Sequence, residues 1–243
     1  MKKVYFYGTC LVDLFFPDAG MAGIQLLRQA GLEVVFPEGQ TCCGQPAYNC
    51  GYWEEARAVA RAQVALFPDD LPVILPSGSC AGMMKVHYPE LFHGEPDESQ
   101  VRAFSGRVYE LTQFLVDVLH VQLKDLGAPV KVTWHSSCHA LRDLGLKVEP
   151  QSLLGQLENV EVAPLAREYE CCGFGGTFSV RQPEISGAMV CDKSADAEAT
   201  GASVLLSTDG GCLLNVNGAL EAKQSQLRVQ HIAEFLWERT HAR

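Results

Sequence analysis

The sequence has few basic residues, and they form no cluster. Its 243 residues include 19 Lys and Arg against 29 Asp and Glu, which gives a formal net charge of −10. A protein that binds nucleic acid needs a basic surface to neutralise the phosphate backbone. Nucleic-acid binding is therefore not expected for this chain.

Long apolar runs are also absent. No run of about 18 uncharged apolar residues occurs, and the N-terminal segment MKKVYFYGTC leads into Asp13 and Asp18 without the apolar core of an export signal. We therefore expect neither a membrane span nor export, and we expect the chain to be cytoplasmic. Apolar residues make up 47% of the sequence and charged residues 20%, a composition that predicts a folded chain rather than a disordered one.

The glycine-rich fingerprints of nucleotide-binding proteins are missing as well. The segment GFGGT at 173–177 resembles a phosphate-binding loop, but its glycines do not have the spacing of a dinucleotide-binding or P-loop motif. No flavin or nicotinamide fingerprint is present. Any redox cofactor of this chain must therefore be held by other residues.

Cysteine, in contrast, is abundant. The chain has 10 cysteines, which is about twice the number in an average sequence of this length. Structural disulfides do not persist in the cytoplasm, so such a pattern indicates metal binding or catalysis. Thiolate ligands to a metal are the leading interpretation.

Eight of the ten cysteines belong to a pattern that occurs twice. In each half, a β-type run ends in a first cysteine, a second run leads to a vicinal pair followed by Gly, and a third run leads to a last cysteine. Matched cysteines lie 128, 129 and 132 residues apart, so their order and spacing are both kept. The sequence therefore predicts an internal duplication. The repeated residues are Cys10, Cys42, Cys43 and Cys80 in the first copy and Cys138, Cys171, Cys172 and Cys212 in the second.

Helical patterns separate the predicted strands. Strands that alternate with helices are typical of parallel α/β units, and short uninterrupted apolar runs suit strands that are buried on both faces. We therefore expect two pseudo-symmetric small α/β domains with mainly parallel sheets, over residues 1–127 and 128–243. Strands are expected at 4–10, 33–37, 73–75, 130–138, 160–164 and 204–206, and helices at 22–30, 53–67, 109–123 and 184–200.

The cysteine pattern has three chemical interpretations. The carboxyl ends of parallel strands share one edge of a sheet, so the four cysteines of each half can converge there. Adjacent cysteines in extended backbone point to opposite sides, which is awkward for one small ion but suits a cluster of several metal atoms. An iron–sulfur cluster in each half is therefore favoured over structural zinc held by four thiolates. Thiol–disulfide exchange at the vicinal pairs is the third interpretation, although C-x-x-C is the usual redox pair.

Other residues near the pattern have less definite roles. Cys50 and Cys191 each occur in one half alone, and we interpret them as buried small hydrophobic residues rather than ligands. His135 and His139 flank Cys138, where either could bind a metal or move a proton, although a lone histidine near a strand end is more often structural. His139 is the weak candidate for a catalytic residue.

The cysteine spacing resembles that of the cysteine-rich, or CCG, domain family, whose members include a component of heterodisulfide reductase and the glycolate oxidase iron–sulfur subunit. In the first copy 31 residues separate Cys10 from Cys42 and 36 separate Cys43 from Cys80, and the second copy has 32 and 39. With the segments TCCGQPAYN and CCGFGGTFSV, the chain looks essentially end to end like the iron–sulfur subunit of a bacterial L-lactate oxidation system.

This resemblance implies an electron-transfer role. The chain would hold an iron–sulfur cluster, such as 4Fe-4S, in each domain and would serve a complex that oxidises L-lactate to pyruvate. The resemblance also implies two partners, the companion B and C proteins of lactate utilization, with ferredoxin-type clusters in the B protein. Because the chain lacks a ferredoxin module and a flavin fingerprint, we do not expect it to oxidise lactate alone.

The chain departs from the family motif in one respect. The full motif ends in C-x-x-C, whereas Cys80 is followed by AGM and Cys212 by LLN. The fifth cysteine is therefore absent from both copies. Its absence counts against heterodisulfide reduction, and a zinc-binding scaffold protein remains the main alternative to electron transfer.

Overall fold

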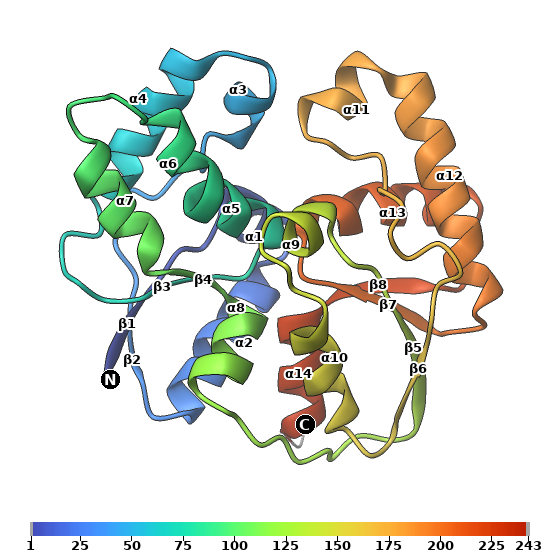
Figure 1. Cartoon of the computed structure of the whole chain (residues 1–243). Coiled ribbons are helices and arrows are strands. Elements are labelled where there is room, and N and C mark those ends of the chain that lie inside the picture. Colours follow the sequence, from blue (N-terminus) through green and yellow to red (C-terminus); the bar gives the residue numbers. More distant parts are fainter. Residues whose placement is uncertain (1, 242–243) are drawn as a thin grey trace.

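The structure, a computed structural model, describes residues 2–241 and has two halves that lie side by side (Figure 1). Each half contains a four-stranded, wholly parallel sheet. The strand orders, β2-β1-β3-β4 and β6-β5-β7-β8, are the same topology repeated. The expected duplicated α/β fold is confirmed. The strands are β1 (Lys3–Phe6), β2 (Glu33–Val35), β3 (Val73–Leu75), β4 (Val108–Glu110), β5 (Val130–Trp134), β6 (Val160–Ala163), β7 (Val204–Ser207) and β8 (Arg228–His231).

Helices connect the strands in both halves. Among residues 2–241, no helix combines the length and the apolar character needed to cross a membrane. The first half contains α1 (Cys10–Phe15), α2 (Pro17–Gln29), α3 (Gln45–Asn49), α4 (Trp53–Val64), α5 (Gly78–Gly82), the π-helical turn η1 (Met83–His87), α6 (Tyr88–Leu91), α7 (Glu98–Gly106), α8 (Leu111–Gln113) and the π-helical turn η2 (Phe114–Val118). The second half contains α9 (Cys138–Arg142), α10 (Val148–Gly155), α11 (Thr177–Arg181), α12 (Pro183–Ala199), α13 (Gly210–Ala222) and α14 (Ile232–Thr240).

The fourth strand of each sheet differs from the sequence prediction. The helix expected over 109–123 begins at Leu111 and its π-helical continuation ends at Val118, because 108–110 forms the edge strand β4. Its counterpart β8 is not predicted from the sequence either. Both strands are short and run directly into a helix, so the apolar spacing of the helix obscures the strand before it.

Alternate residues of the central strands face different cores. In β1, Val4 and Phe6 belong to a core that the two halves share, whereas Tyr5 packs among the first half's own helices. In β7, Leu206 faces the shared core and Leu205 the core of the second half. Successive side chains of a strand point to opposite faces, so both faces of these sheets are covered. The prediction of strands buried on both faces is confirmed.

The two halves contact each other through pairs of helices. Each contact between a helix of the first half and one of the second is repeated by the corresponding helices with their roles reversed. Helix α2 packs against α14, and α10 packs against α8 and η2. Near the cysteines, α1 packs against α13 and α5 against α9, at the centre of the molecule (Figure 1). The shared core joins Phe6 and Leu26 to Trp134 and Leu236. The division at residue 127, in the segment between η2 and β5, remains a prediction about the repeated units.

Candidate metal centres

The repeated cysteines lie where chain segments leave the carboxyl edges of the two sheets. Cys10 begins α1 and Cys138 begins α9, each shortly after a central strand. Cys80 and Cys212 lie in the first turns of α5 and α13, after the next strand of each sheet. The vicinal pairs lie in the loops that follow β2 and β6. Parallel topology therefore brings these distant segments to one edge of each sheet.

Within each half, four thiols form a continuous chain of contacts. The thiols of Cys10 and Cys42 lie close enough to interact, and the thiol of Cys43 interacts with those of both Cys42 and Cys80. Ligation of a single centre requires this convergence. The second half repeats the order with Cys138, Cys171, Cys172 and Cys212.

The first cysteine of each vicinal pair is stabilised as a thiolate. Hydrogen bonds from Cys10 and Cys43 lower the pKa of Cys42 far below its ordinary value, and the backbone N–H of Gly44, 3.4 Å from the Cys42 sulfur, adds to this effect. The pKa of Cys171 is lowered in the same way. Because thiolates are the form that binds metals, this cysteine is the one prepared for ligation in each half, while its hydrogen bonds with Cys10 and Cys43, and with Cys138 and Cys172, raise the pKa of those four thiols.

The glycine after each vicinal pair is required by the backbone. Gly44 and Gly173 both have φ of 85°, a left-handed conformation that glycine adopts without a steric penalty. At Gly173 a side chain would also meet the backbone of Ser186. This turn lets the glycine N–H point back at the sulfur two residues earlier, at 3.3 Å from Cys171 in the second half.

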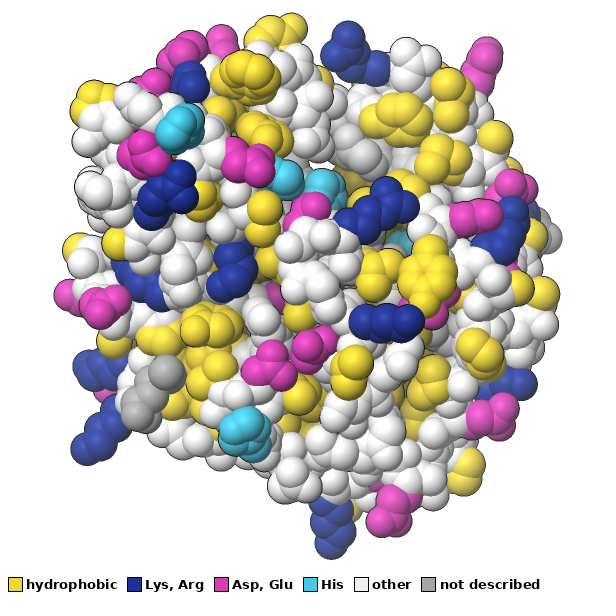
Figure 2. All heavy atoms as spheres, viewed as in Figure 1, with side chains coloured by type: hydrophobic (Ala, Val, Ile, Leu, Met, Phe, Trp, Pro, Cys, Tyr) yellow, Lys and Arg dark blue, Asp and Glu magenta, His cyan; other side chains and the backbone are white. Residues whose placement is uncertain are grey.

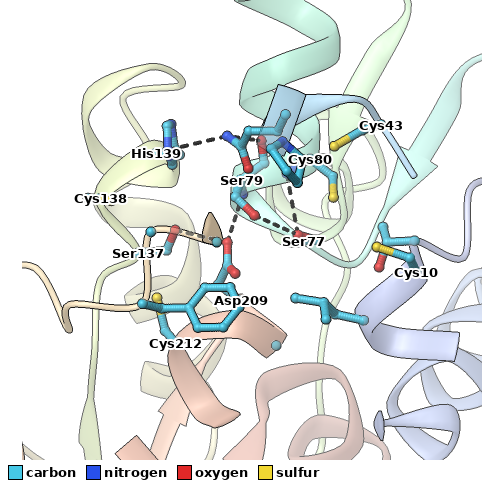
Figure 3. A pocket seen from close by; sticks show the side chains of 18 of the residues that line it. Cys10, Cys43, Ser77, Ser79, Cys80, Ser137, Cys138, His139, Asp209 and Cys212 are labelled. Atoms are coloured by element: carbon cyan, nitrogen blue, oxygen red, sulfur yellow. Dashed lines mark hydrogen bonds between the residues drawn. The ribbon is translucent and has the colours of Figure 1, made fainter. Parts of the chain in front are cut away.

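All eight repeated cysteines line a single cavity of about 160 Å³ between the halves. In Figure 3, Cys10, Cys43 and Cys80 approach it from one side and Cys212 from the other. Figure 2 shows the corresponding notch between the halves at the top of the view, with hydrophobic side chains on both sides. Because α1 contacts α13 and α5 contacts α9, the two groups of thiols face the same space.

The donor set fits a metal. Soft thiolate ligands favour iron–sulfur clusters and zinc, and both are commonly held by four cysteines. Each half supplies four cysteines linked in one chain of contacts. The arrangement therefore suits a metal centre in each half and is compatible with either kind of metal.

The interpretation of Cys50 and Cys191 as buried core residues is wrong. Cys191 is exposed on α12, and Cys50 is partly exposed, with its sulfur 3.0 Å from the hydroxyl of Thr177 in the other half. Hydrogen bonds from Thr177 and Arg181 lower the pKa of Cys50. The residues that line the cavity include neither cysteine, which agrees with leaving both out of the ligand set.

His139 lines the cavity and is held by a carboxylate. Its Nδ1 lies 2.5 Å from Asp143 Oδ2, and its Nε2 lies 3.2 Å from the side-chain nitrogen of Gln45. When Nδ1–H donates to Asp143, Nε2 is free to accept a hydrogen bond from Gln45. His87 of the first half also approaches the Asp143 carboxylate, at 3.3 Å. Sequence patterns do not single out these partners, although the i, i+4 spacing of His139 and Asp143 on a helix is a usable signal.

A buried carboxylate joins the two halves beside the cavity. Asp209 Oδ2 accepts the N–H of Ser79 at 2.8 Å and the hydroxyl of Ser137 at 3.1 Å, and Oδ1 accepts the N–H of Gly211 at 3.3 Å. Ser79 belongs to the first half and directly precedes Cys80. Figure 3 shows Asp209 between these groups. One side chain thus fixes the segments that carry cysteines of both centres.

Asp209→Ala is expected to lower the free energy of unfolding by about 3 kcal/mol, because it leaves buried donors unpaired. Urea denaturation under anaerobic conditions measures the effect. Asp192→Ala is the matched control, since Asp192 makes an exposed ion pair with Arg167 at 3.4 Å, and such pairs contribute less than about 1 kcal/mol. Equal effects of the two substitutions would contradict the bridging role of Asp209.

Comparison with known proteins agrees with the geometry. Residues 4–85 and 132–217 match the model of the CCG cysteine-rich domain. Proteins called lactate utilization protein A from Geobacillus kaustophilus and Bacillus licheniformis are 47% and 46% identical over 96% of this chain and 98% of their own length. A hypothetical protein from Helicobacter pylori matches the whole chain with a TM-score of 0.64 at 12% identity; the chain spans 49% of that protein, and the match supports the fold alone. This chain therefore belongs to the CCG cysteine-rich domain family, and within it to the group of proteins called lactate utilization protein A.

Proposed function

We propose that this chain is the iron–sulfur electron-transfer subunit of a bacterial system that oxidises L-lactate to pyruvate. Cys10, Cys42, Cys43 and Cys80 would hold one cluster, and Cys138, Cys171, Cys172 and Cys212 the other. The names of the relatives supply the link to lactate utilization. The observation that carries the electron-transfer role is the cavity lined by all eight thiols. Two centres that face one small space are placed to exchange electrons.

The charge of the cavity supports the proposal that another protein of the system binds lactate. Its lining, among the residues that the structure describes, contains Asp209 but no Lys or Arg. A carboxylate substrate is ordinarily recognised by a cation, above all by the paired donors of arginine. We therefore propose that the protein side chains of this cavity do not bind lactate and that a partner supplies that site.

His139 is the proposed proton carrier of the cavity. Its Nε2 faces Gln45 while Asp143 holds the other ring nitrogen, so the ring is oriented as a general base usually is. A metal cluster, when bound, would take up electrons, and His139 would balance the charge by moving a proton at Nε2. Its catalytic role rests on this orientation.

The proposed partners are the companion B and C proteins of lactate utilization, with ferredoxin-type clusters in the B protein. Exposed apolar side chains on α11 and at the start of α4 agree with docking on this side of the molecule. Val180 on α11 is 80% exposed, and Tyr52 and Trp53 near the start of α4 are 60% and 57% exposed. Helices α3 and α11 flank the notch from opposite halves (Figure 1). We also propose a cytoplasmic location, since reactive thiols require a reducing compartment.

Turnover of lactate tests this division. The purified chain is expected not to oxidise lactate with an artificial electron acceptor, whereas the chain co-expressed with both companions is expected to do so. The control is the same complex with Cys43→Ser and Cys172→Ser in this chain, which should bind its partners and lose the activity. Steady lactate oxidation by the purified chain, without added protein or flavin, would contradict the proposal that partner proteins are required.

Zinc in both halves is the alternative, and colour separates it from iron–sulfur. An anaerobic preparation with clusters is expected to be brown, with broad visible absorption and an EPR signal after reduction. Zinc has neither visible absorption nor redox chemistry. A colourless preparation with about two zinc ions per chain would replace electron transfer by a structural role.

A further inference from the structure

His135 is a buried imidazole without a hydrogen-bond partner. Its side chain is 1% exposed, and neither ring nitrogen has a partner among the residues that the structure describes. A buried polar atom left unpaired costs about 1–3 kcal/mol. Folded proteins rarely leave such an atom without a partner, so a group that binds nitrogen is expected beside this ring.

The neighbours of His135 are two cysteines of the second centre. A ring nitrogen of His135 and the sulfurs of Cys172 and Cys212 all lie within 4.8 Å of one another, and all three residues are buried. Two ligands of one tetrahedral metal ion lie roughly 3.5–4 Å apart, since metal–sulfur and metal–nitrogen bonds are about 2.3 and 2.0 Å long. The three atoms are thus close enough to share a metal.

The first half has no such residue at the matching position. Tyr7 precedes Cys10 by the same three positions by which His135 precedes Cys138. The Tyr7 hydroxyl donates to the carbonyl of Thr41 at 2.6 Å, so its polar group is already paired within the protein. The duplication is therefore unequal at this buried position, where the second half places an imidazole beside two of its repeated cysteines.

We propose that His135 is a nitrogen ligand of the second metal centre, beside Cys172 and Cys212, and that this ligand makes the two centres chemically different. The inference rests on the proposed metal centre of the second half. In an iron–sulfur cluster, neutral imidazole in place of an anionic thiolate raises the reduction potential, so this effect applies where His135 takes the place of one of the four thiolates on an iron atom. Where both centres hold iron, the second centre would therefore be reduced before the first.

Cobalt is a suitable probe, because Co²⁺ is paramagnetic and accepts sulfur and nitrogen ligands. The chain is produced with ¹⁵N-histidine, freed of metal under anaerobic conditions and loaded with Co²⁺ alone. Pulsed EPR is expected to show one directly bound ¹⁵N nucleus. The coupling is expected to disappear in His135→Gln and to persist in His139→Gln, which removes the other histidine of this segment.

Each result decides the proposal. Cobalt–thiolate absorption without a directly bound nitrogen in the unaltered chain would overturn the role of His135 and leave the thiolate centres in place. A coupling that is lost in His139→Gln instead would overturn it as well. Failure to bind cobalt at all would overturn both the ligand and the metal centre. If His135→Gln does not fold, the labelled unaltered chain still shows whether any histidine nitrogen is bound, and absence of the coupling there overturns the proposal.

Discussion

Replacing Cys43 by serine is expected to lower the metal content of the chain to about one half, because it removes the centre of the first half alone. Cys43 is buried and contacts both Cys42 and Cys80, so it lies in the middle of the thiol chain. A serine hydroxyl is a harder and much weaker ligand for the metals that thiolates select. Elemental analysis and EPR of anaerobically purified protein measure the loss.

The duplication provides a matched experiment in the other half. Cys172→Ser is expected to remove the second centre to the same extent, and the double variant should retain almost no metal. Cys191→Ser and Cys50→Ser are the controls, since neither thiol lines the cavity. If Cys50→Ser lost as much metal as Cys43→Ser, the separation of ligands from other cysteines would be wrong.

Removing the metal is expected to lower the melting temperature by on the order of 10 °C. In each half, thiols from three separate segments meet at one centre, and the metal holds those segments together when it binds. Contacts between the halves, such as that of Asp209 with Ser79, depend on the same segments. Removing the metal should therefore destabilise both halves. Calorimetry of the chain before and after anaerobic chelation gives the change.

The chelation experiment has an internal control. The variant with both Cys43→Ser and Cys172→Ser should melt at one temperature with or without chelator, because it has no metal to lose. Refilling the unaltered chain with metal should restore its original melting temperature. Equal melting temperatures of the metal-free and metal-bound chain would show that the centres are incidental to folding.

Local patterns in the sequence predicted most of the strands and the repeated site. The runs at 73–75 and 204–206 form strands buried on both faces, because short apolar runs bounded by turns specify such strands through nearby residues alone. The duplicated cysteine spacing predicted the two similar halves, and Pro183 correctly marked the start of α12. Edge strands β4 and β8 were missed because their short runs carry a weaker local signal than the helices that follow.

The relation between the halves depended on contacts that no local pattern encodes. Crosswise packing of α1 on α13 and of α5 on α9 decided that both groups of thiols face one cavity. The same packing left Cys191 exposed and brought Cys50 against Thr177, although both look like core residues in the sequence.

The sequence by itself determined which residues are candidate metal ligands, and the tertiary structure decided which of them meet. Strand and helix patterns, and the order of the cysteines, follow from side-chain periodicity and turn residues within short segments. The structure brings His135 next to Cys172 and Cys212, and it brings Asp209 of one half next to Ser79 of the other. In both cases the residues that meet are more than 30 positions apart in the sequence. Burial decides whether such a polar group needs a partner, and burial is a property of the packed chain rather than of any segment.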